Sequence, residues 1–194
     1  MEIHEWNKRY RLREHAASDL ESPPTPLLVE TAKHLAPGKA LDLACGAGRN
    51  AIWLAEHGWD VTAVDGASEA IKILRGRAAE RGLKIDAIVA DLEKSEYKIK
   101  PSRWDLIAIC YYLQQSLFEP AERGVRPGGI LISIVHIPEP GQAPTRHSLR
   151  PGELDSFFKG WEILHRFEGI PSDAPHRRPV AEIVARRPLK SWPE

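Results

Sequence analysis

The stretch KALDLACGAGRN, residues 39–50, decides the fold of this 194-residue chain. It begins as an apolar strand that carries one acid, Asp42, and continues as a glycine turn that opens a helical pattern. Gly46 and Gly48 let the backbone turn sharply and let a ligand approach without a Cβ in the way, and the following helix points free N–H groups at that ligand. A second strand ends at Asp65, about 20 residues later, where a nucleoside-binding βαβ unit places a carboxylate for the ribose hydroxyls. The stretch therefore predicts a cofactor site.

The same turn is compatible with more than one class of cofactor. Gly46, Gly48 and Ala51 also satisfy the G-x-G-x-x-A pattern of nicotinamide and flavin enzymes. In those enzymes the turn receives a pyrophosphate, and Asp42 would then lie near like charge at a cost of about 1 kcal/mol or more. S-Adenosylmethionine carries a sulfonium and an ammonium group instead, and a nearby carboxylate favours both. An NAD-dependent oxidoreductase and a noncatalytic nucleoside-binding protein remain the alternatives.

Three further motifs follow the turn in the order that a doubly wound sheet requires. Along the chain they are Ala90-Asp91-Leu92 after a third strand, Cys110-Tyr111 after a fourth, and Arg126-Pro127-Gly128-Gly129 before a fifth. With them the chain resembles the class I S-adenosylmethionine-dependent methyltransferases over about residues 6–188. The resemblance implies an α/β, Rossmann-like, doubly wound and mostly parallel seven-stranded sheet, with the last strand antiparallel and an N-terminal helical lid.

The resemblance also implies the cofactor, S-adenosylmethionine, with S-adenosylhomocysteine as the product. The residues that match the cofactor-binding motifs are Asp42, Ala44, Cys45, Gly46, Gly48, Arg49, Asn50, Asp65, Asp91, Leu92, Cys110 and Tyr111. Members of the class accept a hydrogen bond from the adenine amino group at the position of Asp91, and use the backbone N–H of the next residue, Leu92. Ala44 stands where many members have a first glycine. Cys110 and Tyr111 are expected to border the reactive methyl group.

Within the class, four features resemble the tellurite-resistance (TehB-type) methyltransferases, which methylate small oxyanions such as tellurite and selenite. They are the Trp-x-x-x-Tyr start, the glycine turn, the Pro151-Gly152-Glu153-Leu154 helix start and a late His-Arg pair. The resemblance makes His176, Arg177 and Arg178 the candidate catalytic residues. A soft anionic nucleophile needs only a cationic clamp, for which arginine is well suited. A generic thiol, N- or O-methyltransferase is the alternative, and a histidine would then take the acceptor's proton.

The length and pattern predict a single methyltransferase domain over residues 1–194. It divides into an N-terminal helical cap at 1–36, an S-adenosylmethionine-binding core at 37–188 and a proline-rich substrate loop at 136–150. Trp6 and Tyr10 lie four residues apart in the cap. They either form part of a lid over the cofactor or simply pack on the core.

Composition limits the partners that are expected. The chain has 27 basic and 27 acidic side chains, so no overall field attracts nucleic acid. It has no apolar run near the roughly 20 residues that cross a membrane, and its polar start does not resemble a signal peptide. Its two cysteines form no metal-binding pattern. We therefore expect a cytoplasmic protein, monomeric or homodimeric, that uses no metal and acts on a small-molecule substrate.

Overall fold

The computed structural model describes residues 2–12, 22–174 and 176–189. The chain falls into two compact units, Met1–Lys98 and Ile99–Glu194, which we call the first and the second unit.

The seven strands form a mostly parallel sheet. The last strand, β7 (Val180–Arg186), runs antiparallel to both of its neighbours, β5 (Val125–His136) and β6 (Glu162–Gly169). This arrangement confirms the predicted α/β fold class with an antiparallel last strand.

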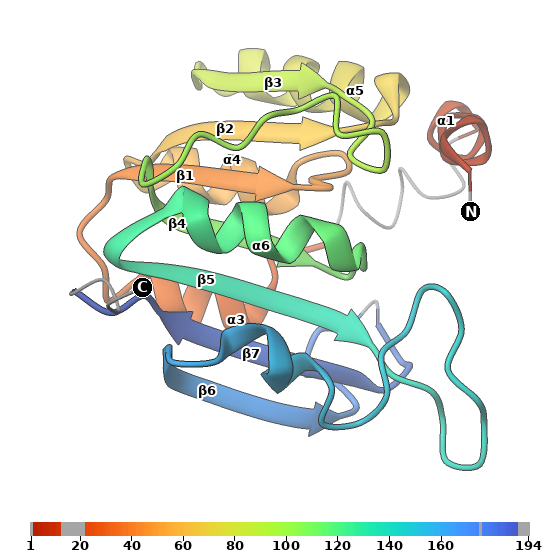
Figure 1. Ribbon diagram of the computed structural model, residues 1–194. Coiled ribbons are helices and arrows are strands. Elements are labelled where there is room, and N and C mark those ends of the chain that lie inside the picture. The colour runs from red at the N-terminus through yellow and green to blue at the C-terminus, as the bar shows by residue number, and fades with distance from the viewer. Residues whose placement is uncertain (1, 13–21, 175, 190–194) are drawn as a thin grey trace. The chain divides into compact units, whose positions relative to one another are not determined.

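The first unit contains three parallel strands in the order β3-β2-β1. These are β1 (Lys39–Leu43), β2 (Asp60–Asp65) and β3 (Ile85–Val89), connected through α4 (Arg49–Glu56) and α5 (Ser68–Glu80). Apart from their first residues, β1 and β2 are buried almost throughout, as expected for parallel strands covered on both faces. Figure 1 shows both helices behind these three strands.

Two shorter helices complete the first unit. The helix α1 (Ile3–Arg11) packs against α5, and Figure 1 shows it beside the end of that helix. The helix α3 (Pro26–Ala32) begins with a proline at its first position, where the missing N–H leaves no hydrogen bond unmade. Residues 13–21, which belong to the predicted cap, lie outside the described residues.

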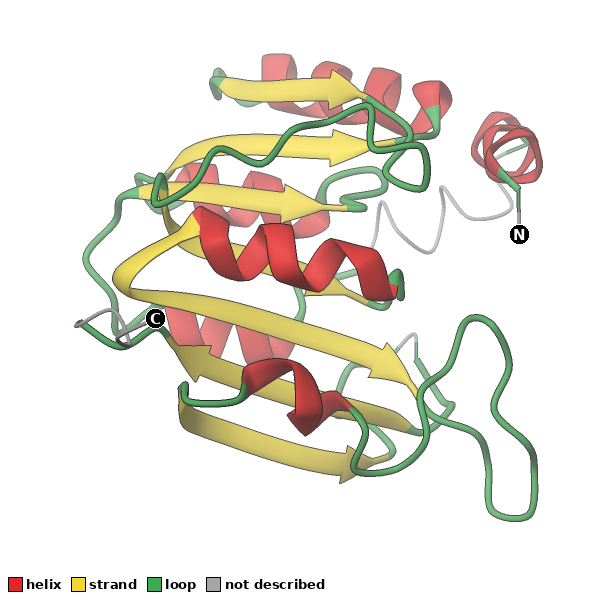
Figure 2. Ribbon diagram, in the orientation of Figure 1, coloured by secondary structure: helices red, strands yellow, loops and turns green. Residues whose placement is uncertain are grey.

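The second unit contains four strands in the order β4-β5-β7-β6, of which β4 (Trp104–Cys110) is parallel to β5. A helix not expected from the sequence, α6 (Gln115–Gly124), connects these two strands although it contains Pro120. The helix whose start was predicted at Pro151-Gly152-Glu153-Leu154 is a short 3-10 helix, η1 (Leu154–Phe158). After β5 the chain forms a long exposed loop, which Figure 2 shows in green; it closes where the N–H of Leu149 donates to the carbonyl of His136 at 3.0 Å.

Candidate functional site

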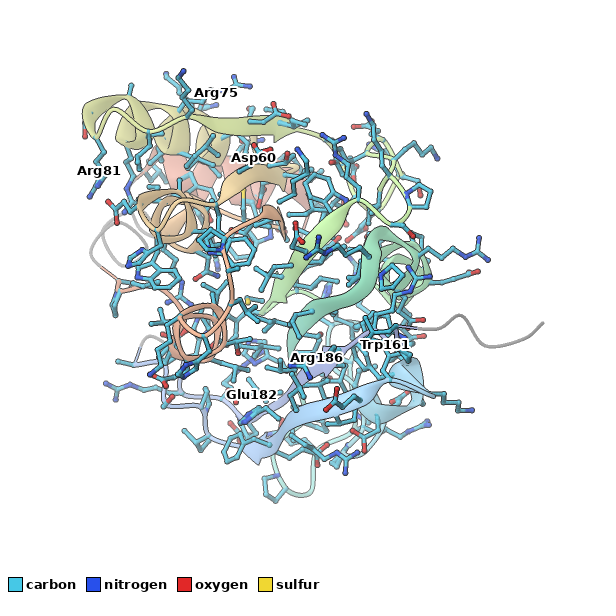
Figure 3. All side chains as sticks on the ribbon, turned by 90° about the vertical axis from the view of Figure 1, so that its left-hand side faces the viewer. Asp60, Arg75, Arg81, Trp161, Glu182 and Arg186 are labelled. Atoms are coloured by element: carbon cyan, nitrogen blue, oxygen red, sulfur yellow. The ribbon has the colours of Figure 1, made fainter. Side chains whose placement is uncertain are left out.

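In the first unit, the predicted cofactor residues lie at or just after the carboxyl ends of β1, β2 and β3. Figure 3 looks onto the opposite end of these strands, where the labelled Asp60 begins β2 and pairs with Lys39 at 2.8 Å. Ligands of open α/β sheets bind outside the carboxyl ends of the strands. The charged pair of Asp60 and Lys39 is therefore remote from the candidate site.

The glycine turn is built from residues with left-handed backbone. Ala44, Gly46 and Gly48 have φ angles of +55°, +54° and +82°. The N–H of Cys45 donates to the carbonyl of Val64 at 3.1 Å, which ties the turn to β2. A left-handed conformation costs an L-residue about 1–2 kcal/mol. Ala44 therefore carries backbone strain at the position where many class I methyltransferases are expected to have glycine.

Gly48 is required for packing as well as for conformation. It is the N-cap of α4, and a Cβ built on it would lie 2.2 Å from Cδ1 of Leu74, a fully buried side chain of α5. The sequence suggested that Gly48 lets the backbone turn sharply and gives a ligand close access to it. The structure adds a second reason: the turn lies directly against α5.

Asp42 is a buried acid whose charge is only partly compensated. It is 1% exposed, and its Oδ2 has no hydrogen-bond partner among the described residues. Burial, followed by the neighbouring charge of Asp65, raises the pKa of Asp42 to about 7, although the charge of Arg49 and a backbone hydrogen bond from Ala51 act in the opposite direction. A cation near Oδ2 would stabilise the ionised form.

Asp65 connects the turn to the start of α5. Its Oδ2 accepts the N–H of Gly46 and its Oδ1 accepts the N–H of Ala67, both at 2.8 Å. The charge of Asp65 also acts on Cys45: burial, then Asp65, raises the pKa of this thiol well above its usual range. Cys45 is therefore a neutral thiol in the turn rather than a nucleophile.

Arg49 and Asn50 bind the segment that precedes α3. The Arg49 guanidinium donates to the carbonyl of Pro23 at 3.1 Å and to the hydroxyl of Thr25 at 3.0 Å. The Oδ1 of Asn50, which is buried, accepts the N–H of Thr25 at 2.8 Å. The sequence placed both residues in the cofactor site. In the structure their side chains hold the N-terminal segment on the first turn of α4.

Asp91 lies in the turn after β3 and is held ionised. Its Oδ1 accepts the N–H groups of Glu93 at 2.9 Å and Lys94 at 3.3 Å, and its Oδ2 pairs with the Lys94 ammonium at 3.0 Å. Burial alone would raise the pKa of Asp91, but these hydrogen bonds and the charge of Lys94 outweigh it and lower the pKa. Leu92, the next residue, is buried. An ionised carboxylate is the acceptor that the adenine role requires.

The helix α1 packs onto the residues around the glycine turn. Tyr10, which is 5% exposed, forms a buried cluster with Ala47 of the turn and with Ala67 and Ala70 at the start of α5, and Trp6 packs against this cluster. Of the two interpretations of Trp6 and Tyr10, packing on the core is therefore the one the contacts support directly. The same contacts place α1 against the turn itself.

Polar contacts fix α1 to the N-terminus of α5. The Oδ1 of Asn7 accepts the N–H of Glu69 at 2.9 Å and the hydroxyl of Ser68 at 3.3 Å. Arg11 pairs with the carboxylate of Glu69 at 3.3 Å. The N-cap of α5 is Ala67, which has no side-chain acceptor, so Asn7 supplies the cap from another helix. Sequence reasoning missed this residue.

In the second unit, Tyr111 brings together several predicted residues. It directly follows Cys110, the half-buried last residue of β4, and has a left-handed φ of +60°. Its hydroxyl donates to Oδ2 of Asp173 at 2.8 Å, and its ring stacks on that of His176 with centroids 3.4 Å apart and planes 3° apart. His176 in turn donates its backbone N–H to the carbonyl of Asp173 at 2.9 Å.

The second unit also places His136 near the predicted catalytic residues. The His136 ring, at the end of β5, lies 6.1 Å from the His176 ring and 5.9 Å from the Tyr111 ring. Burial, then the charge of Arg178, lowers the pKa of His136, so its imidazole is neutral at pH 7. Arg177 and Arg178 are exposed. The structure therefore groups His176 and Arg178 with two residues outside the predicted set, His136 and Asp173.

Comparison with known proteins identifies a family. The model of the family described as "Tellurite resistance protein TehB" matches residues 24–173. The chain is 28% identical over 151 residues to "Hemagglutinin 1" of Eikenella corrodens, covering 73% of this chain and 49% of that protein. It is 26% identical over 153 residues to the "Probable S-adenosyl-L-methionine-dependent methyltransferase TehB" of Haemophilus influenzae, covering 74% of this chain and 52% of that protein.

A solved structure agrees with this match. The crystal structure of TehB from Haemophilus influenzae superimposes with a TM-score of 0.71 at 26% identity, covering 82% of this chain and 61% of that one. The chain spans about half the length of the curated relatives it matches. No described helix combines the length and the apolar composition that a membrane span requires.

Proposed function

Because the chain belongs to the TehB tellurite-resistance family, we propose that it is a methyltransferase that uses S-adenosylmethionine to methylate a small acceptor. When bound, S-adenosylmethionine supplies an electrophilic methyl carbon activated by the neighbouring sulfonium. Methyl transfer is then an in-line displacement, in which the protein aligns the nucleophile and excludes water. The single observation that carries this proposal is the match of the TehB family model over residues 24–173.

The residues of the first unit fit this cofactor. Asp42 has a buried carboxylate oxygen without a hydrogen-bond partner among the described residues, and Asp65 adds a second negative charge nearby. This charge distribution suits a ligand with ammonium and sulfonium groups and disfavours a pyrophosphate. Asp65 would bind the ribose hydroxyls, and Asp91 with the backbone of Leu92 would bind the adenine. The NAD-dependent alternative has no comparable support.

For the acceptor, we propose a small oxyanion such as tellurite or selenite. Its support is the family to which the chain belongs, together with the exposed guanidinium groups of Arg177 and Arg178 beside His176. A guanidinium binds an oxyanion with two parallel hydrogen bonds and needs no proton transfer to do so. Arg177 and Arg178 would hold the oxygens and leave the soft central atom free to attack the methyl carbon.

Isothermal titration separates the cofactor classes. We expect S-adenosylmethionine and S-adenosylhomocysteine to bind and NAD not to bind. The unchanged protein is titrated first, and the Asp65→Ala variant is titrated second. Binding of NAD with no binding of either adenosyl ligand would refute the methyltransferase proposal.

Turnover with labelled S-adenosylmethionine tests the acceptor. Arg177→Ala or Arg178→Ala should reduce methylation of selenite or tellurite and leave cofactor affinity nearly unchanged. Arg166→Ala is the matched control, because Arg166 is an exposed arginine of the same unit that pairs with Asp155 at 2.9 Å. If the unchanged protein methylates only a thiol, an amine or a hydroxyl compound, the oxyanion proposal fails. The neutral His136 would then be the better candidate for removing the acceptor's proton.

A further inference from the structure

Tyr111 adopts a backbone conformation that its side chain disfavours. At φ +60°, a bulky non-glycine residue is an outlier, and such residues persist only where surrounding contacts hold them. The N–H of Tyr111 donates to the carbonyl of Ile134 at 2.7 Å, so the strained backbone is fixed to β5. From this position, just after β4, the side chain contacts the segment that precedes β7.

The side chain of Tyr111 then makes two contacts far along the sequence. The hydroxyl donates to Asp173, 62 residues away, and the ring stacks on His176. Asp173 is 2% exposed, and a buried polar side chain needs hydrogen bonds to replace those it loses from water. The carbonyl of Asp173 accepts the N–H of His176, so the two contacts and this backbone bond close a ring of interactions.

The neighbouring tyrosine behaves differently. Tyr112 donates its hydroxyl to Oε1 of Gln114 at 2.9 Å, only two residues along the chain. This hydroxyl contact is therefore local in sequence. The hydroxyl bonds of the two adjacent tyrosines therefore differ, because that of Tyr111 is to a loop residue 62 positions away.

We propose that Tyr111 and Asp173 are positioning residues that hold His176, and with it Arg177 and Arg178, in the orientation that binds the methyl acceptor. This inference rests on the proposed function, because it assigns the loop before β7 to the acceptor. It changes the role expected of Tyr111, which the family resemblance placed among the cofactor-binding residues. It also adds Asp173, which no motif indicated.

The physical reason is that an exposed arginine pair orders poorly without support. Each long side chain loses rotamer freedom when it is fixed. Fixing the backbone beside the pair in advance, through the stacked His176 ring and the Asp173 carbonyl, leaves only the side chains to be ordered when the acceptor binds. Loss of the anchor should therefore weaken acceptor binding and leave the first unit's cofactor residues unaffected.

The kinetic test uses Tyr111→Phe, which removes one hydroxyl and retains the stacked ring, and Tyr111→Leu, which removes both. We expect the KM for the acceptor to rise about tenfold in Tyr111→Leu and less in Tyr111→Phe. The Kd for S-adenosylmethionine should change by less than about twofold in both variants. The control, Tyr112→Phe, should leave the acceptor KM and the cofactor Kd unchanged.

A spectroscopic readout keeps the inference testable if the protein methylates none of the acceptors tried. In the folded protein, the ring current of Tyr111 should shift the ring protons of His176 upfield, because the two rings lie 3.4 Å apart. This shift should persist in Tyr111→Phe and Tyr112→Phe and disappear in Tyr111→Leu. Asp173→Asn retains an oxygen that can accept the Tyr111 hydroxyl, so it should keep near-normal behaviour, whereas Asp173→Leu should resemble Tyr111→Phe, because both variants remove the bond between hydroxyl and carboxylate and keep the stacked ring.

Three results would overturn the inference. The first is an unchanged acceptor KM in Tyr111→Leu with a folded protein. The second is an S-adenosylmethionine Kd that rises as much as the acceptor KM, which would return Tyr111 to the cofactor site. The third is a His176 spectrum that does not respond to Tyr111→Leu, which would refute the anchor itself. Failure of the unchanged protein to transfer methyl groups, with the spectroscopic result as expected, would instead refute the proposed function and leave the anchor in place.

Discussion

Replacing Gly48 with alanine tests how the glycine turn is built. The residue has a φ of +82°, where alanine costs about 1–2 kcal/mol more than glycine. Its new Cβ would lie 2.2 Å from Cδ1, 3.0 Å from Cγ and 3.1 Å from Cδ2 of Leu74. Leu74 is 0% exposed and has no solvent to move into, so the overlap adds about 1–3 kcal/mol of overpacking. We expect Gly48→Ala to lower the free energy of unfolding by roughly 2–5 kcal/mol.

A double-mutant cycle with Leu74→Ala separates strain from overlap. Leu74→Ala alone leaves a cavity and should cost about 2–5 kcal/mol. In the double variant the new Cβ enters the space that Leu74 vacated, so the overlap disappears and only the backbone strain of Gly48→Ala remains. Urea unfolding should therefore give a combined loss smaller than the sum of the single losses by about 1–3 kcal/mol. Strictly additive losses would show that the turn does not lie against α5 in this way.

Gly76→Ala is the matched control for this cycle. Gly76 lies in the same helix, two residues after Leu74, and a Cβ there would meet nothing within 4 Å. Alanine in an open helical position should stabilise the protein by about 0.5–1 kcal/mol.

The affinity for S-adenosylmethionine then distinguishes the two roles of Gly48. If the double variant regains stability but not cofactor binding, the turn needs a bare backbone for the ligand as well as for packing.

Three further predictions concern the polar groups of the first unit. For Asp42, the free energy of unfolding should fall as pH rises from about 4 to about 7, because the raised pKa means that folding favours the protonated acid. The shift corresponds to at most about 4 kcal/mol, and pH-resolved denaturation of Asp42→Asn should show a dependence smaller by that contribution. Because a bound cation favours the ionised carboxyl, the affinity for S-adenosylmethionine should rise over the upper part of this pH range in the unchanged protein but not in Asp42→Asn. An affinity that does not change with pH in the unchanged protein would contradict a role of Asp42 in binding the cofactor's cation. For Asp65, replacement by alanine should weaken cofactor binding by about 1.5–3 kcal/mol in calorimetry, and unchanged affinity in a folded variant would exclude the ribose role. Asn7→Ala should cost about 1 kcal/mol of stability and speed hydrogen exchange at the amide of Glu69, with Asn7→Asp as the control that retains an acceptor; exchange that stays slow would rule out the cap.

The parts of the fold that the sequence predicted well are those with local, repeated signals. The strands β1, β2 and β3 and the helices α4 and α5 follow runs of apolar residues whose spacing is set by the backbone itself. The helix α6 was missed because Pro120, near its middle, indicates a break when only local propensity is considered. Its apolar face, with Phe118 stacked on Phe157 of η1, stabilises the helix through contacts that no local window contains.

The residues of the candidate site also fall into those that a sequence motif predicts and those that only the fold brings together. Asp42, Asp65 and the glycines of the turn follow a motif, and their predicted positions at the ends of β1 and β2 agree with the structure. Asp173 stands in a loop with no periodicity, where it is buried and accepts the hydroxyl of Tyr111, 62 residues away. His136 is the first residue of the predicted substrate loop, but only the fold brings its ring to 6.1 Å from that of His176. Sequence spacing carries no information about pairings of this kind.

The sequence at the start of α5 does indicate that this helix lacks a capping side chain of its own. A helix that begins after Gly66-Ala67 has no capping side chain of its own at Ala67, so its first N–H groups must find acceptors elsewhere. Asp65 accepts the N–H of Ala67, and Asn7 accepts the N–H of Glu69.

This arrangement does not compete with the proposed role of Asp65 in ribose binding. Each carboxylate oxygen of Asp65 accepts one backbone N–H in these bonds, while a carboxylate offers about four lone-pair sites in all. The same residue can therefore hold the turn, begin the helix and bind a pair of hydroxyls. Because the backbone bonds fix both oxygens in advance, the diol would meet acceptors that are already oriented.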